Sequence, residues 1–336
     1  MHIPLTPDTT IYVAVSANVT GGPRDLHKLA YDLRALYKVK KVLMYYIGAT
    51  SEKPVPAPYA QYGLDYTQKI EDSEENILII PEIYTHLFSD LRRIQKVIYW
   101  LSVDNYYLSA AYFRRHPLMG RVNKWIFERG SSYYLWFEQE LKKIPYHLAQ
   151  GYYVYDHLLK KGVPGVFYLI NHIDPKALEQ KVDIAMKKDI VAYTPKRGYA
   201  FTKKIIDASP DITFVPIINM NYEQMVHVLK EAKVFLDFGH HPGKDQMPRE
   251  SAILGCCVIT GRRGAAKFFE DIAIPEDCKF TEHDSDIPKI REKIKNFLHN
   301  YESETKKFDG YREKTRDERK VHLACLHEIF SFTPRA

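Results

Sequence analysis

The chain has 336 residues, of which 45% are hydrophobic and 27% are charged, with a formal net charge of +6. This composition excludes a disordered or fibrous protein, and the length suits two domains better than one. No apolar run approaches the roughly 20 residues that a membrane span needs, and the amino-terminal residues lack the pattern of a secretory signal. We therefore expect a cytoplasmic protein whose mild positive charge suits a polyphosphate ligand or an anionic lipid surface.

The first half of the chain alternates apolar runs typical of buried strands with patterns typical of helices. The strand-like runs are 10–19, 39–48, 76–84, 96–103 and 166–174, a helical pattern covers 20–38, and 146–163 reads as a short strand followed by a helix. This alternation is typical of a parallel sheet covered by helices.

A charged segment over 175–189 separates this half from a second series of strands and helices. The sequence therefore predicts an α/β protein with two Rossmann-like domains, whose parallel sheets face a central cleft. The expected organisation is an amino-terminal domain over 1–174, a connector over 175–189, a second domain over 190–300, and a helical tail over 301–336 that packs back on the first domain.

The stretch HPGKDQMPRESAILGCCVITGRRG, from His241, combines a glycine loop after a strand with the start of a helix. We expect Pro248 at the first helical position and Glu250 in the first turn, because proline lacks the N–H that would be unbonded there. Such a helix start directs backbone N–H groups at an anion, Lys244 adds a charge, and Glu250 can accept hydrogen bonds from ribose hydroxyls. The alternative is structural: Glu250 favours the helix dipole, and Lys244 and Arg249 are solvated surface charges.

The segment PRESAILGCCVITGRRG resembles the donor signature of the GT-B glycosyltransferases, which have two Rossmann-like domains, and is most similar to the bacterial group 1, family-four-like type. The resemblance implies that Glu250 binds the ribose of a nucleotide sugar. It also implies contacts with the donor sugar and phosphates from the loop before it, at Gly243, Lys244, Asp245, Gln246 and Met247. The family carries a second glutamate eight residues earlier, where this chain has Pro242, so its hexose contacts and stereochemistry do not carry over directly.

A second match, VAYTPKRGYAFTKKII, follows the family's strand with a basic pair that neutralises the diphosphate. Lys196 and Arg197 fill that position; because they are adjacent here and spaced in the family, Lys203 or Lys204 can supply the second charge. The resemblance further implies that Asn219 and Met220 hold the base and that Gly21 and Gly22 form a glycine loop near the transferred sugar.

The expected chemistry stabilises the charge that develops on the leaving nucleoside diphosphate, without a metal ion or another cofactor. The four cysteines show no metal spacing, and Cys256 and Cys257 lie in an apolar run that predicts buried thiols. An inverting reaction needs a base after a strand of the first domain, for which His86, Glu82 and Asp104 are candidates; each is also compatible with a purely structural role.

Basic and aromatic residues alternate over 112–137, a pattern that suits an anionic inner-membrane surface or a polyprenyl-diphosphate-linked acceptor and does not indicate nucleic-acid binding. The sequence thus predicts a glycosyltransferase, of the hexosyltransferase class, that moves a sugar from a UDP- or GDP-sugar to a lipid-linked or polysaccharide acceptor in O-antigen, lipopolysaccharide or capsule synthesis. Two alternatives stay open: another sugar-nucleotide enzyme such as an epimerase, and a non-catalytic nucleotide-sugar-binding protein of the same fold.

Overall fold

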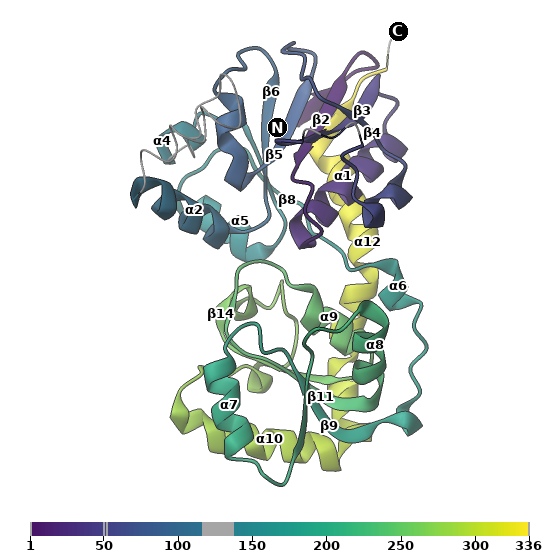
Figure 1. Ribbon diagram of the computed structural model, residues 1–336, viewed down its shortest axis with the longest axis vertical. Coiled ribbons are helices and arrows are strands. Elements are labelled where there is room, and N and C mark those ends of the chain that lie inside the picture. The colour runs from purple at the N-terminus through teal and green to yellow at the C-terminus, as the bar shows by residue number, and fades with distance from the viewer. Residues whose placement is uncertain (1, 50, 52, 116–137, 335–336) are drawn as a thin grey trace. The chain divides into compact units, whose positions relative to one another are not determined.

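The structure, a computed structural model, describes residues 2–49, 51, 53–115 and 138–334. The chain divides into two compact units, coloured along the sequence in Figure 1. Unit 1 consists of Met1–Gln150, Val154–Ile170 and His322–Ala336, and unit 2 consists of Gly151–Tyr153 and Asn171–Val321.

Unit 1 is built on a seven-stranded sheet in which every pair of neighbours is parallel. The strands, in their order across the sheet, are β4 (Asp65–Thr67), β3 (Lys41–Tyr46), β2 (Thr10–Val15), β5 (Ile77–Pro81), β6 (Gln95–Trp100), β7 (Tyr146–Ala149) and β8 (Val166–Tyr168). Strands β2 and β5 are buried along their whole length, so both faces of this sheet are covered.

Alternate residues of β2 contribute to two separate hydrophobic cores, one on each face of the unit 1 sheet. Ile11 and Val13 pack in the core that includes α1 (Gly21–Leu36), whereas Tyr12 packs in the core that includes α2 (Val103–Arg115) and α5 (Tyr152–Lys160). The remaining helical segments here are η1 (Ala57–Tyr62), η2 (Glu82–Phe88) and α4 (Glu138–Leu141).

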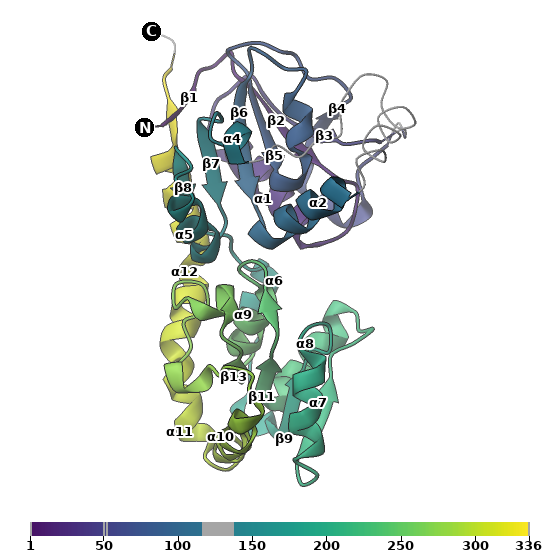
Figure 2. The ribbon, with the colours of Figure 1, turned by 90° about the vertical axis from the view of Figure 1, so that its left-hand side faces the viewer.

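The first and last strands of the chain pair with each other in unit 1. β1 (Ile3–Leu5) is parallel to β15 (Phe330–Phe332), and the two strands lie side by side in Figure 2. The preceding helix α12 (Asp309–Ile329) contributes Leu326 and Ile329 to the same core as α1. Unit 1 is therefore completed by residues from the far end of the sequence.

Unit 2 contains a four-stranded parallel sheet around a single core. Its strands, in order, are β10 (Thr213–Pro216), β9 (Lys188–Tyr193), β11 (Ala232–Asp237) and β13 (Cys257–Thr260), beside a short pair formed by β12 (His240–His241) and β14 (Arg263–Gly264). The helices are α6 (Pro175–Leu178), α7 (Tyr199–Asp207), α8 (Tyr222–Glu231), α9 (Gln246–Ile253), α10 (Ile287–His299) and α11 (Tyr301–Glu304), with 3-10 segments η3 (Ile184–Met186), η4 (Ala265–Lys267), η5 (Glu276–Cys278), η6 (Asp284–Asp286) and η7 (Thr305–Phe308).

Three local expectations need correction. Strand β5 ends at Pro81, and the rest of the expected strand over 76–84 is the 3-10 segment η2. Helix α9 begins at Gln246, so Pro248 is its third residue and Glu250 falls after the first turn, which contains no acidic residue. Proline is tolerated there because first-turn N–H groups have no partner within the helix.

The expectation of buried thiols is confirmed, because Cys256 and Cys257 are unexposed and neither forms a disulfide. Within the described part of the chain, no helix is long and apolar enough to cross a membrane.

Candidate anion-binding site

The candidate site lies at the carboxyl edge of the unit 2 sheet. Tyr193, the last residue of β9, pairs with Leu236 of the parallel strand β11, so the loops that follow these strands leave the sheet at the same edge. One loop carries Lys196 and Arg197, and the other leads through His241 to α9. Ligands of open parallel sheets bind at this edge.

Two glycines allow the backbones of these loops to touch. Gly198 has a φ of 60° and Gly239 a φ of 106°, both in the left-handed region that favours glycine. A Cβ atom at Gly198 would lie 2.4 Å from the carbonyl carbon of Phe238, and one at Gly239 would lie 2.6 Å from the amide nitrogen of Gly198. This close approach places the residue that directly precedes Gly198 beside the loop between β11 and α9.

Arg197 is that residue, and two carboxylates hold it. Its Nη1 donates to Oδ2 of Asp245 at 2.6 Å, and its Nη2 lies 3.7 Å from Oδ2 of Asp237. Burial opposes the charge of Arg197, but the two carboxylates outweigh burial and raise its pKa. Because 27% of the side chain remains exposed, the guanidinium is both oriented by the protein and accessible to a ligand.

His241 holds the same carboxylate from the other side. Its Nδ1 lies 2.9 Å from Oδ2 of Asp245, and its Nε2 lies 3.2 Å from the backbone oxygen of Asp237. Although the burial of Asp245 would raise its pKa, His241 and Arg197 lower it below the ordinary value. Asp245 is therefore a shared partner of Arg197 and His241 and is not a side chain that extends freely into a ligand site.

Lys244 and Arg249 are paired inside unit 2. Lys244 Nζ lies 3.1 Å from Oε1 of Glu318, and Arg249 Nη1 lies 2.5 Å from Oε2 of the same carboxylate. All three side chains are at most 2% exposed. The reading of Lys244 and Arg249 as solvated surface charges is wrong; burial lowers the pKa of Lys244, and its charge in this structure is directed at Glu318.

The other basic candidates differ in their surroundings. Lys196 is exposed beside Arg197. Lys203 lies on α7 and pairs with Asp207 at 2.6 Å, and Lys204 pairs with Asp284 at 2.8 Å. Arg197, with Lys196 next to it, is therefore the basic residue that the structure places directly at the carboxyl edge.

The residues expected to contact the donor ribose and sugar lie around the start of α9. Gln246 and Met247 are its first two residues, and Asp245 precedes them without capping the helix through its side chain. Gly243 is buried in the loop, and Glu250 is only 5% exposed.

A hollow of about 500 Å³ lies beside the residues expected to hold the base. Asn219, which has a φ of 54°, and Met220 line it with Glu223, Gln224, His227 and Val228 of α8. Pro216, the end of β10, pairs with Tyr193, so the loop that carries Asn219 leaves the sheet at the same edge as Arg197.

The unit 1 candidates are placed as follows. Gly21 and Gly22 form the first turn of α1, where a glycine loop was expected, and a Cβ atom at Gly22 would lie 3.1 Å from Cδ1 of Leu101. Asp104 is in the first turn of α2. Most of the predicted acceptor segment, 112–137, lies outside the described residues.

Glu82 and His86 are both buried in η2, directly after β5. Oε2 of Glu82 accepts a hydrogen bond from the amide of Leu101 at 2.9 Å, and burial raises its pKa to about 7. Burial lowers the pKa of His86 to about 4, so its imidazole is neutral at pH 7.

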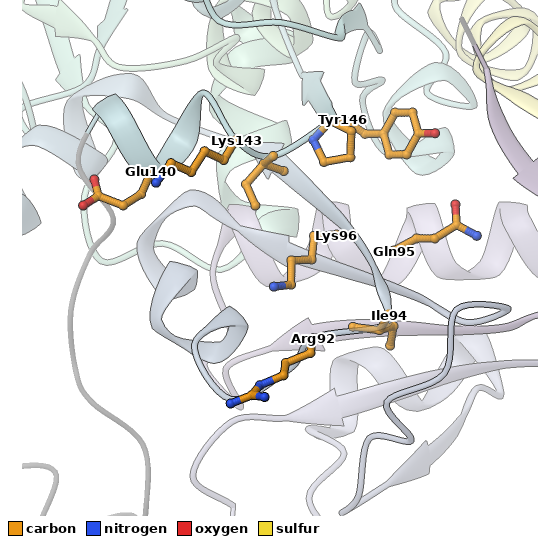
Figure 3. A pocket seen from close by; sticks show the side chains of 9 residues that line it. Arg92, Ile94, Gln95, Lys96, Glu140, Lys143 and Tyr146 are labelled. Carbon is orange, nitrogen blue, oxygen red and sulfur yellow. The ribbon is translucent and has the colours of Figure 1, made fainter.

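A separate hollow of about 570 Å³ lies at the opposite, amino-terminal edge of the unit 1 sheet, where β6 and β7 begin. Figure 3 shows Arg92, Lys96 and Lys143 extending around it from three different segments. Ligands of parallel sheets bind at the other edge, so this hollow is not part of the candidate site.

Comparisons with known proteins identify the fold. No protein-family model matches the chain, and no curated protein matches it in sequence. Sucrose-phosphate synthase from Thermosynechococcus elongatus is similar in structure, with a TM-score of 0.60, 11% identity, and coverage of 95% of this chain and 98% of that one. Anabaena HepE in complex with UDP has a TM-score of 0.57 and 8% identity, covering 95% and 97% of the two chains. The chain has the GT-B fold.

Another structure of this fold is S. aureus TarM, a mutant of which was solved with fondaparinux, alpha-GlcNAc-glycerol and UDP. It matches with a TM-score of 0.52 and 12% identity over 77% of this chain. The GT-B chain described here spans only 56% of the length of TarM.

Sequence reasoning missed three residues at or next to the site: Asp237, His241 in its bonded role, and Glu318. An acidic residue that ends a buried apolar strand was a usable signal for Asp237. Nothing in the sequence marks Glu318 as the partner of Arg249, 69 residues earlier.

Proposed function

We propose that this protein is a glycosyltransferase that takes its sugar from a nucleoside diphosphate sugar. The observation that carries the proposal is the side chain of Arg197, oriented by Asp245 and accessible to solvent at the carboxyl edge of the sheet. A guanidinium held in this way stabilises the negative charge that develops on a leaving diphosphate as the bond to the sugar breaks. The GT-B fold supports the same chemistry.

The remaining donor contacts belong to the same proposal. Lys196 supplies a second charge to the diphosphate, the base occupies the hollow at Asn219 and Met220, and Glu250 with the residues at the start of α9 binds the ribose and sugar. No metal ion is needed, because the charge is met by side chains and by the amino end of α9.

The acceptor side is proposed from the sequence pattern and from similar proteins. The acceptor is a glycan or a polyprenyl-diphosphate-linked sugar of a surface polysaccharide, and 112–137 contacts an anionic membrane. An inverting reaction uses His86 or Asp104 as its base; the imidazole of His86 is unprotonated at pH 7, and its lowered pKa, about 4, makes it a weak base.

A thermal-shift screen with UDP, GDP and their sugars tests the donor. At a ligand concentration near 100 times Kd, we expect the melting temperature to rise by about 5–10 °C. Arg197→Gln should weaken binding by about 10–100-fold, because a charge-assisted hydrogen bond is lost. Lys295→Gln is the matched control, since that exposed lysine pairs with Asp211 and is not among the proposed donor contacts.

No shift with any of these nucleotides would contradict the proposal. Where a nucleotide sugar binds, product analysis separates the activities: donor conversion without acceptor identifies an epimerase, and binding with neither transfer nor hydrolysis identifies a binding protein.

A further inference from the structure

The side chain of His241 makes two contacts that one neutral imidazole cannot satisfy together. Nδ1 faces the carboxylate of Asp245 at 2.9 Å, and Nε2 faces the backbone carbonyl oxygen of Asp237 at 3.2 Å. Both partners are acceptors, whereas a neutral imidazole has one N–H donor and one lone pair. Both contacts are hydrogen bonds only if the ring carries two protons and a positive charge. The ring is fully buried, so water cannot satisfy the second nitrogen.

The charges around His241 support this protonation state. Burial alone would lower the pKa of His241, but Asp237 and Asp245 raise it above the ordinary value, against an opposing effect of Arg197. The four groups form a closed cluster with two cations, His241 and Arg197, and two carboxylates. Its net charge is zero when all four are ionised.

Asp245 couples the two cations. Its Oδ2 accepts from both Arg197, at 2.6 Å, and His241, at 2.9 Å. If His241 were neutral, the whole negative charge of Asp245 would act on Arg197. A charged His241 offsets part of the negative charge of Asp245, so Arg197 attracts an anion more strongly.

Asp237 is the member of the cluster that loses its charge most easily. Its side chain is unexposed, and among the described residues neither carboxylate oxygen has a hydrogen-bond partner. Burial raises its pKa to about 6, against the lowering effects of His241 and Arg197 and with added repulsion from Asp245 and Glu282. Glu282 is itself paired with Arg263 at 2.7 Å. On acidification through pH 6, Asp237 is protonated and the cluster gains a positive charge.

We propose that His241 is a permanently protonated positioning residue that sustains the charge of Arg197 toward the donor diphosphate, with Asp237 as the counterion that sets the strength of this attraction. The inference rests on the proposed function, because it assumes that the anion at Arg197 is the diphosphate of a nucleotide sugar. It goes beyond that function by assigning a role to the charge of His241, a side chain that acts through Asp245 and Arg197 and does not contact the ligand.

The charge of His241 can be measured without any ligand. We expect the histidine ¹³C and ¹⁵N NMR signals of His241, assigned by their loss in His241→Gln, to report an imidazolium at pH 7. A neutral ring at pH 7 would overturn the inference whether or not nucleotides bind.

A charge-compensation series tests the coupling, with calorimetric titrations of UDP-glucose and GDP-mannose. His241→Gln should weaken binding about tenfold, and Asp237→Asn should tighten it about threefold, each through a change of one unit of charge. The double variant restores the net charge and should bind about threefold more weakly than the natural protein, and clearly more tightly than His241→Gln. The matched control, His283→Gln, removes an exposed histidine of the same unit and should have no effect.

A structural role for His241 gives a different pattern, in which the double variant binds no better than His241→Gln; that result overturns the inference. The pH dependence adds a second readout. The diphosphate of a nucleotide sugar keeps its charge over about pH 5.5–7.5, so tighter binding at the acidic end reports Asp237. This dependence should vanish in Asp237→Asn.

The two proposals fail differently. Binding that is unchanged across the series overturns the role of His241 and leaves the donor assignment standing. If neither nucleotide sugar binds the natural protein, the donor assignment itself fails, and a charged His241 then serves the fold alone.

Discussion

At the carboxyl edge of the unit 1 sheet, Glu82 and His86 are buried about as deeply as Asp237 and His241 are at the same edge of the unit 2 sheet. In unit 1 burial moves both groups toward the neutral form, because it raises the pKa of Glu82 to about 7 and lowers that of His86 to about 4. In unit 2 the pKa of His241 is raised, because carboxylates face its ring. Burial also raises the pKa of Asp237, to about 6, so the two regions differ in their histidines: the carboxylates that face His241 outweigh the effect of burial on its pKa.

The difference suits the two halves of a transfer reaction. In the proposed function, the diphosphate meets the guanidinium of Arg197, which two carboxylates orient. The acceptor hydroxyl meets groups at the edge of unit 1 that burial moves toward their neutral forms. The comparison can be tested in each unit separately.

The largest expected change in the free energy of unfolding comes from removing the buried carboxylate that pairs with two cations in unit 2. Glu318→Gln removes the carboxylate that pairs directly with the buried cations Lys244 and Arg249, so the free energy of unfolding should fall by about 3–5 kcal/mol. Urea denaturation measures the change. Glu313→Gln, on the exposed face of the same helix, should change it by less than about 0.5 kcal/mol. Equal stability of the two variants would show that the pairing contributes little.

The next effect concerns the contact that positions Arg197. Gly198→Ala places a Cβ atom against the backbone of Phe238 at a left-handed φ, which should cost about 3 kcal/mol and reduce nucleotide binding together with stability. Gly21→Ala is the control, because a Cβ atom there meets no atom within 4 Å. Thermal melts with and without nucleotide measure both effects, and normal stability of Gly198→Ala would rule out the close approach.

The smallest effect is the pH dependence of unit 1. The pKa of Glu82 is about 7 in the folded protein, above the ordinary value of 4.5, so the folded state binds the extra proton between these limits. Stability from this group is present below about pH 4.5 and is lost as the pH rises through 7. Glu82→Gln should therefore be more stable than the natural protein by up to about 3 kcal/mol at pH 8 and equal at pH 4.

Urea denaturation at the two pH values measures the difference. Glu74→Gln, an exposed carboxyl, should show no such dependence. A variant that is less stable at pH 8 would mean that Glu82 is ionised and paired in the folded state.

Much of the fold could be predicted because buried parallel strands are short apolar runs between helical patterns. Strand-like runs were expected at 10–19 and 39–48, and strands β2 and β3 occur at Thr10–Val15 and Lys41–Tyr46. Arg197 was identified because, with Lys196, it fills the position of the basic pair that follows a strand in the family that the sequence resembles. The convergence of Arg197 with Asp245 was implied only by family resemblance.

The rest depended on contacts between distant residues. The pairing of Lys244 and Arg249 with Glu318 could not be read from local spacing, because basic residues near a helix start look the same whether they face solvent or a carboxylate in the core. Similarly, Gly198 and Gly239 each follow a strand end, but only the structure shows that their backbones touch.

The pairing of β1 with β15 has a consequence for how the protein is made. During synthesis all of unit 2 leaves the ribosome before Phe330–Phe332, so β1 cannot pair with β15 until nearly the whole chain has been made. A premature stop after residue 321 would remove no part of unit 2, yet it would leave unit 1 with an exposed strand edge and an uncovered apolar surface at Leu326 and Ile329. Quality-control proteases would then degrade the product because of a defect at its beginning, although the lesion lies at its end.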